Sequence, residues 1–481
     1  MKRSPLAVSA AALLLLTLPL SACKQASPDT EGADTAEVVT IPPVTIPDKP
    51  DDRKPTDLAP YEEGLDSLFA TSTPSPAEDF TFEVSDAMTA TVTGYVGGNT
   101  VVVIPDTLDG AAVTAISSGA FKDKTTVKAI SVPDTVTTIG KGAFEGCKSL
   151  TSMRTPVYTC EDAPYFGALF GAATHEANGY TVPNGLATLV LTAGETVPAC
   201  TFYACRSLKA VALPETVTEI GDFAFYGCQS MAYIAMGDTA LTSVGRNAFT
   251  NCSALLTLDI PATVQTLGFA MLEGCAALES LTLPFAGGCR VGYTEDVGED
   301  APADTNYLGY IFGAADYTFT EGFLPASLIS VALLEGCGDI PANAFFECDS
   351  LRTVTLPEGV TAIGRRAFYG CKKLAEMALP DSVQSLGDDA FHGCLRLASF
   401  TGGAGLTTLG VQTFMDCVSL KIVTLPDTVT HLPNACFAGC ISLVSLTADG
   451  VQTEGKQVFR HCDRLGLPWV NPECVPSETE K

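Results

Sequence analysis

The residues of this chain best suited to chemistry are its thiols and imidazoles. The sequence holds 18 cysteines and 4 histidines, and the histidines lie far apart, at His175, His392, His431 and His461. They form no His-Glu-x-x-His motif, and the sequence has no Cys-x-x-Cys pair. A Gly-x-Ser-x-Gly elbow and a phosphate-binding loop are also absent. The sequence therefore predicts no catalytic residue, no metal site and no cofactor, and a protein that is not an enzyme.

Most of the cysteines follow a period. They stand three residues after a phenylalanine, in the pairs Phe144/Cys147, Phe202/Cys205, Phe225/Cys228, Phe249/Cys252, Phe345/Cys348, Phe368/Cys371, Phe391/Cys394, Phe414/Cys417, Phe437/Cys440 and Phe459/Cys462. Within the two unbroken runs the pairs return every 22 to 24 residues, a spacing that indicates a solenoid of stacked coils. Counting Cys275, eleven cysteines occupy this position.

The cysteines of this ladder are expected to be buried and reduced, because the position requires a small buried hydrophobe. Disulfides between neighbouring coils are the alternative, but side chains in a stack point in parallel and a disulfide needs a specific dihedral angle. Outside the ladder, other cysteines are better candidates for disulfides, although no sequence rule pairs them. They are Cys160, Cys200, Cys289, Cys337, Cys436 and Cys474.

A typical repeat unit places a short strand before a proline. Val211 and Leu213 are two residues apart and would face the core, whereas Ala210 and Ala212 would face outward. Pro214 ends the strand because it has no backbone donor. One such coil cannot bury its own apolar face. Parallel stacking of the copies, each adding about 4.8 Å, has to complete the core.

The full unit reads Leu-x-x-Val-x-Leu-Pro-x-x-Val-x-x-Ile-Gly-x-x-Ala-Phe-x-Gly-Cys, and it resembles the BspA-like (treponemal-type) leucine-rich repeat of bacterial surface proteins. The resemblance covers about residues 80–465 and implies a β-rich leucine-rich-repeat solenoid of about fourteen stacked coils. Coils are expected to be less regular where Gly237 replaces the proline and where Met271 stands for the phenylalanine. Intact copies are Leu351 to Cys371, Leu374 to Cys394 and Leu420 to Cys440.

Two longer units interrupt the period and resemble each other. One begins with Phe166-Gly-Ala-Leu-Phe-Gly-Ala-Ala173 and the other with Leu308-Gly-Tyr-Ile-Phe-Gly-Ala-Ala315. We interpret them as enlarged coils of the solenoid. Between residues 287 and 306 the chain has few apolar residues, and its acidic part, 295–304, predicts a solvated loop. Calcium binding there is the alternative, although the carboxylates lack the alternating spacing of a calcium loop.

The N-terminal residues predict a bacterial lipoprotein signal. Lys2 and Arg3 precede an apolar run, which ends in Leu20-Ser-Ala-Cys23. This pattern predicts a signal peptide at 1–22 and a lipid on Cys23, which would anchor the chain to the membrane on the extracellular side of the envelope. An uncleaved membrane anchor or an ordinary secretory signal is the alternative, but the apolar run is short for a spanning helix.

The rest of the chain divides by composition. Residues 23–60 are rich in Pro, Asp, Glu and Thr, which predicts a disordered stalk. Residues 61–110 include alternating strand-like segments and are interpreted as an N-terminal β cap. The solenoid is placed at 111–465 and a C-terminal tail at 466–481.

The exposed sheet is the natural binding platform of such a solenoid, and most of its outward positions are Ser, Thr or Ala. The exceptions form the candidate binding face, with Tyr233 and Arg154 as the leading anchors because aromatic and arginine side chains dominate binding energy. These exceptions are Arg154, Tyr233, Asp259, Glu376 and Ile422. The alternative is a sheet that is merely soluble and binds nothing.

The charge balance limits the partners. The chain has 27 Lys and Arg against 55 Asp and Glu, a net charge of −28, so nucleic acid is excluded as an expected partner. The family resemblance implies protein binding and adhesion to host extracellular-matrix proteins, host cells or other bacteria. A surface binding protein for a nutrient glycan or peptide is the alternative, and a hydrolase sited in the enlarged coils is a third possibility.

Overall fold

The computed structural model describes residues 69, 73–237, 239–289 and 305–466. Several predictions lie outside these residues. They concern the signal peptide, the lipid on Cys23, the stalk at 23–60, the acidic loop at 295–304, Cys474 and nearly all of the C-terminal tail.

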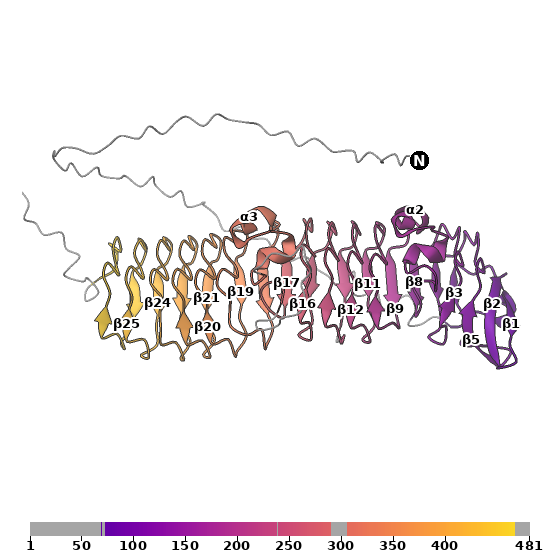
Figure 1. The fold of residues 1–481 in the computed structure, drawn as a ribbon, viewed down its shortest axis with the longest axis horizontal. Helices are drawn as coiled ribbons and strands as arrows, with labels where there is room; N and C mark the ends of the chain where they lie inside the picture. The colour runs from indigo at the N-terminus through magenta and orange to yellow at the C-terminus, as the bar shows by residue number, and fades with distance from the viewer. Residues whose placement is uncertain (1–68, 70–72, 238, 290–304, 467–481) are drawn as a thin grey trace, which may run out of the picture. The chain divides into compact units, whose positions relative to one another are not determined.

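The described chain winds into a β-rich leucine-rich-repeat solenoid, which confirms the predicted fold (Figure 1). Each regular coil adds one parallel strand to a row that we call the broad sheet face. The row divides into three sheets. Their strands are β3 (Val101–Val103), β6 (Ala129–Ser131), β8 (Ser152–Thr155), β9 (Thr188–Leu191), β11 (Ala210–Ala212) and β13 (Tyr233–Ala235); β15 (Thr257–Asp259), β17 (Ser280–Leu283), β18 (Ser330–Leu333) and β19 (Thr353–Thr355); and β21 (Glu376–Ala378), β23 (Ser399–Thr401), β24 (Ile422–Thr424) and β26 (Ser445–Thr447).

A second row of two-residue strands follows the proline turn of the coils. Its strands also pair in parallel, and all but the last have their second residue, such as Ile220, in the core. The strands are β7 (Thr138–Ile139), β10 (Thr196–Val197), β12 (Glu219–Ile220), β14 (Ser243–Val244), β16 (Thr266–Leu267), β20 (Ala362–Ile363), β22 (Ser385–Leu386), β25 (His431–Leu432) and β27 (Thr453–Glu454). Each coil is therefore held to its neighbours along two lines.

The N-terminal strands contain one more coil than the repeat pattern indicates. The strands here are β1 (Phe80–Val84), β2 (Thr89–Tyr95), β4 (Thr107–Leu108) and β5 (Ala111–Ile116). β2 pairs with β5 in parallel, as neighbouring coils do, whereas β1 covers β2 in antiparallel. Tyr95 is 1% exposed and its ring lies 5.6 Å from that of Phe121, so it occupies a bend position. The solenoid accordingly has about fifteen turns where fourteen were predicted.

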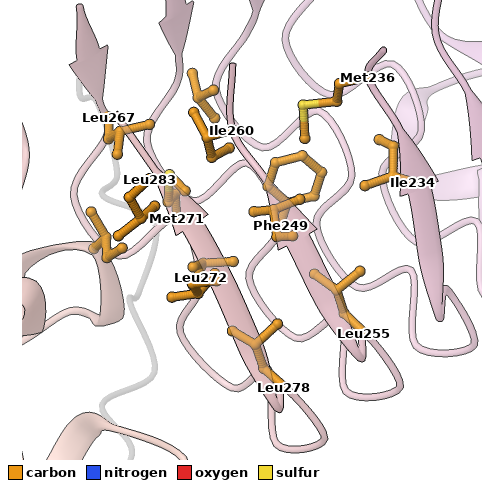
Figure 2. Close-up of a cluster of buried hydrophobic side chains, with 14 of the residues drawn as sticks. Ile234, Met236, Phe249, Leu255, Ile260, Leu267, Met271, Leu272, Leu278 and Leu283 are labelled. Atoms are coloured by element: carbon orange, nitrogen blue, oxygen red, sulfur yellow. The ribbon is translucent and has the colours of Figure 1, made fainter. Parts of the chain in front are cut away.

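The bend phenylalanines form buried stacks along the solenoid. The rings of Phe345 and Phe368 lie 5.0 Å apart and 4° from parallel, and those of Phe414 and Phe437 lie 5.3 Å and 2° apart. The prediction that Met271 takes the phenylalanine position is wrong. Phe249 donates its backbone N–H to the Met271 carbonyl, as other bend residues do to that of an alanine. Leu272 therefore takes the bend position, three residues before Cys275, and interrupts the row of rings. Figure 2 shows its side chain in the core with Phe249 and Met271.

The ladder cysteines are free and buried among the described residues. Most of their thiols donate a hydrogen bond to the carbonyl of the bend phenylalanine one coil earlier. Examples are Cys371 Sγ to Phe345 O at 3.1 Å and Cys394 Sγ to Phe368 O at 3.2 Å. The ladder thus has a polar reason for cysteine, since an alanine would pack there but could not donate. The five described cysteines proposed for disulfides outside the ladder also form no disulfide.

The two enlarged coils share one backbone design. Each begins with a 3₁₀ helix that ends at a glycine in the left-handed conformation; this helix is η2 (Phe166–Phe170) in the first coil and η4 (Leu308–Phe312) in the second. A second 3₁₀ helix follows, which is η3 (His175–Ala177) or η5 (Tyr317–Phe319). A one-turn α-helix completes the insertion, α2 (Asn178–Thr181) or α3 (Thr320–Phe323). In the first coil, buried Asn178 accepts from Gly167 N and donates to Thr201 O, both at 3.0 Å. In the second, Thr320 donates to Tyr317 O instead.

The remaining helical element is η1 (Ala77–Asp79), before β1. Within the residues that the structure describes, no helix has the length and apolarity to cross a membrane.

Candidate binding surface

The outward residues of the broad sheet face stand in two columns, because alternate residues of a strand share a face. Tyr233 pairs with Ala210 and belongs to the first column, with Glu376 and Ile422 at the equivalent strand positions. Arg154 pairs with Ser131 and belongs to the second column, which also holds Asp259. The five candidate residues therefore do face outward, but they are distributed over the length of the sheet.

Arg154 forms an ion pair within the solenoid. Its Nη2 lies 3.0 Å from Asp134 Oδ2, and Thr192 donates to the same carboxylate at 2.6 Å. Partial burial would raise the pKa of Asp134, but the hydrogen bonds from Arg154 and Thr192 outweigh it and hold that pKa below its ordinary value. A partner would have to compete with this ion pair, which makes Arg154 a weaker anchor than its residue type suggests.

Tyr233 and Asp259 are the two candidates that the structure brings together. They lie on adjacent strands, β13 and β15, which belong to different sheets. At this interruption the surface is hollowed into an open depression of about 400 Å³. Tyr233 and Asp259 line it with Thr282 and the half-buried Leu334. Ile234, Met236 and Ile260 also border it, but their side chains are at most 4% exposed and pack in the core (Figure 2). No other candidate residue lines this hollow.

Glu376 and Ile422 lie in the C-terminal part of the broad sheet face. Glu376 is exposed on β21, and Ile422 is 51% exposed on β24, two strands further along the same sheet. Ser399 pairs with both of them and separates their side chains. They are accessible single residues and do not form a continuous patch with each other.

The sequence reading missed two aromatic rows on the outside of the bends. One runs from His175 through Tyr203 to Tyr226, with the two tyrosine rings 4.9 Å apart and 6° from parallel. The other runs from Tyr317 through Phe346 and Tyr369 to His392. Both rows begin in an enlarged coil and continue at the residue after the bend phenylalanine. The recurrence of aromatic residues at that repeat position is the sequence signal from which the rows could have been predicted.

Charged side chains tie the second aromatic row to its surroundings. Arg366 lies 5.7 Å from the centre of the Tyr369 ring and 3.4 Å from Asp389, which also contacts His392 Nδ1 at 3.1 Å. Because the row is stacked ring on ring, the faces of Phe346 and Tyr369 are covered. Such rings stabilise the coils and offer only edges to a ligand.

Two ion pairs of Lys372 join the second enlarged coil to the coils that follow. Lys372 Nζ lies 2.6 Å from Asp349 and 3.7 Å from Glu321 on α3. These contacts fix α3 in place at the surface.

The thiols are poorly suited to chemistry in the folded chain. Burial raises the pKa of Cys228 and of Cys275 to about 12, so both are protonated thiols at neutral pH. In the described ranges, no group of three or more His, Cys, Asp and Glu side chains is placed to hold a metal ion. The four histidines do not come together in a cluster, and the ring nitrogens of His392 contact Asp389 and Asp416.

A comparison with protein families identifies the repeats. The family model described as "BspA type Leucine rich repeat region" matches in six copies, over residues 111–163, 190–287 and 338–466. Together these ranges cover more than half of the chain. The unmatched stretches, 164–189 and 288–337, contain the two enlarged coils.

Among solved structures, leucine-rich repeat proteins match this chain at low similarity. A leucine-rich repeat protein from Bacteroides ovatus is 23% identical over 80% of each chain, with a TM-score of 0.32. A leucine rich cell surface protein from Faecalibacterium prausnitzii is also 23% identical, over 79% of this chain and 96% of its own, with a TM-score of 0.32. A sequence search of curated proteins gave no match.

Proposed function

Since the chain belongs to the BspA-type leucine-rich repeat family, whose members are cell-surface proteins that typically bind and do not catalyse, we propose that it is an adhesin. It is anchored by a lipid on Cys23 and binds proteins of host matrix, host cells or other bacteria. The broad sheet face makes the contact, at the depression between β13 and β15.

The depression at Tyr233 and Asp259 is the observation that supports this proposal. Elsewhere the described outward positions are mainly small, and Arg154 is paired with Asp134. An aromatic side chain beside a hollow is an arrangement in which interface binding energy concentrates. A flat row of Ser and Thr offers no such anchor.

The glycan alternative has less support from the broad sheet face and from the two aromatic rows. Sugar rings stack on exposed aromatic faces, but the rings of Tyr203 and Tyr226 lie face to face, as do those of Phe346 and Tyr369. On the broad sheet face, Tyr233 is the aromatic side chain among the candidate positions.

A binding panel tests the proposal. The full chain is applied to immobilised matrix proteins, epithelial cells, other bacteria and a glycan array in one experiment. We expect saturable binding to a protein or cell surface, weakened in Tyr233→Ala and unchanged in Glu358→Gln, which removes an exposed carboxylate outside the candidate binding face. Binding to glycans alone, or protein binding that Tyr233→Ala leaves intact, would contradict it.

Anchoring is tested separately by metabolic labelling with palmitate in a bacterial host. The wild-type chain should incorporate label and sediment with membranes, and Cys23→Ala should do neither. A matched Cys474→Ala variant should be labelled normally. Label that persists in Cys23→Ala would refute the proposed lipid site.

A further inference from the structure

The coil that holds β13 departs from the repeat. The coil between Phe225 and Phe249 has 24 residues, against 23 in most others. Gly237 stands where the proline usually ends the strand, and its φ of 50° turns the backbone into the left-handed region. The depression lies beside this turn, where the row of strands breaks between β13 and β15; the row also breaks between β19 and β21, in a regular part of the repeat.

The lining of the depression combines apolar surface with one carboxylate. Leu334 and Tyr233 contribute partly exposed side chains, whereas Ile234, Met236 and Ile260 are at most 4% exposed and pack in the core. Asp259 is exposed on the adjacent strand, and in the described part of the chain it forms no ion pair.

We infer that this depression receives a lysine or arginine side chain of the protein partner. Such a side chain has an aliphatic stem that packs on apolar surface and a charged end that stays near water. Leu334 and the Tyr233 ring would contact the stem, and the Asp259 carboxylate would accept hydrogen bonds from the cation. This assignment rests on the proposed function, because it names the partner chemistry for the same surface.

Size and charge both favour this occupant. A volume of about 400 Å³ lies towards the lower end of ligand sites, which span about 300–1,000 Å³, so it suits one side chain or a small group. The chain carries a net charge of −28, which attracts basic partners over a distance and repels acidic ones. An acidic side chain would meet Asp259 with like charge, and an apolar one would leave that carboxylate without a partner.

Small probes allow the site to be tested without knowing the partner. Saturation-transfer NMR on the full chain would titrate N-acetyl-arginine amide and N-acetyl-lysine amide against N-acetyl-citrulline amide. Citrulline has the length and shape of arginine but no charge. We expect the arginine and lysine probes to bind about tenfold more tightly than citrulline, as one charge-assisted hydrogen bond is worth about that factor.

Three variants locate the effect. Asp259→Asn should remove the preference for the charged probes, Asp259→Glu should restore part of it, and Tyr233→Ala should weaken all three probes. Glu358→Gln is the matched control, because it removes an exposed carboxylate from a turn outside the candidate binding face. Thermal melts by circular dichroism establish that each variant is folded.

The outcomes separate this inference from the proposed function. Equal binding of arginine and citrulline probes, or a preference retained in Asp259→Asn, would overturn the inference even if the chain still binds a matrix protein or a cell. A charge preference that depends on Asp259, in a chain that binds none of the surfaces in the panel, would support the site and refute adhesion.

Discussion

The bend core and the broad sheet face belong to the same coils but are constructed in opposite ways. At the bends one residue type returns, and Phe345, Phe368 and Phe391 are fully buried and stacked within about 4° of parallel. On the broad sheet face the outward residue changes from coil to coil, and Asp259 and Ile422 are exposed.

This difference separates stability from recognition. A bend side chain contacts its counterparts in the coils before and after it, so a change there disturbs three coils. An outward side chain on the sheet has few neighbours to disturb. Substitutions at the bends should therefore change the free energy of unfolding, whereas those on the face should change binding.

The largest effect is expected from alkaline pH, because it acts on many ladder thiols together. In the folded chain the pKa of Cys228 and of Cys275 is raised to about 12, against an ordinary value near 9.0. The protonated thiol is thus favoured by folding, so its contribution is fully present below about pH 9 and is lost as the pH rises towards 12. Urea titrations between pH 7 and 11 should show the free energy of unfolding falling above pH 9.

A double variant isolates the thiols from other groups that titrate at alkaline pH. Cys228→Ala with Cys275→Ala should have a shallower pH dependence than the wild-type chain above pH 9. An unchanged slope would mean that these thiols are not responsible.

A single bend truncation should give the next largest effect. Phe368→Ala removes a ring that stacks on both Phe345 and Phe391 and leaves a cavity, which costs about 3–5 kcal/mol of unfolding free energy. Phe368→Leu is the matched control and should lose about 1–2 kcal/mol. Equal losses in the two variants, measured by urea titration, would show that the ring stack contributes nothing of its own.

The cysteine of the same ladder should matter less. Cys394→Ala removes one buried sulfur and its 3.2 Å hydrogen bond to Phe368 O, at a cost of about 1–2 kcal/mol. Cys394→Ser keeps a donor at that position and separates the polar contribution from packing.

In the native wild type, the ladder thiols should resist alkylation at pH 8, and unfolding in urea should make them reactive. Rapid alkylation of the native chain would contradict their burial.

The smallest effect is expected on the broad sheet face. Glu376→Gln and Ile422→Thr change exposed side chains and should alter the unfolding free energy by less than about 0.5 kcal/mol. A loss comparable to that of Cys394→Ala would break the distinction between bend and face.

The repeated residues allowed the fold to be predicted, and the unrepeated ones account for what was missed. The phenylalanine and cysteine spacing gave the coils because each copy must pack on the next in one register. Tyr95 was overlooked as a bend residue because it is not a phenylalanine and no cysteine follows it at the usual distance. The outward direction of Tyr233 and Asp259 followed from alternation along a strand, and Gly237 predicted an irregular coil. Their shared depression, however, depends on how the strands of neighbouring coils lie in space, which no local pattern encodes.

The parallel pairing of successive coils also has a mechanical meaning. The bonds between Tyr233 and Lys209, or between Phe368 and Ala390, join one coil to the next and so run along the stacking direction. Tension applied in that direction opens the bonds at one coil boundary before those at the next, because the boundaries are in series. The chain should therefore lengthen under force in many small steps, each releasing one coil, and dissipate work while the rest of the stack stays folded.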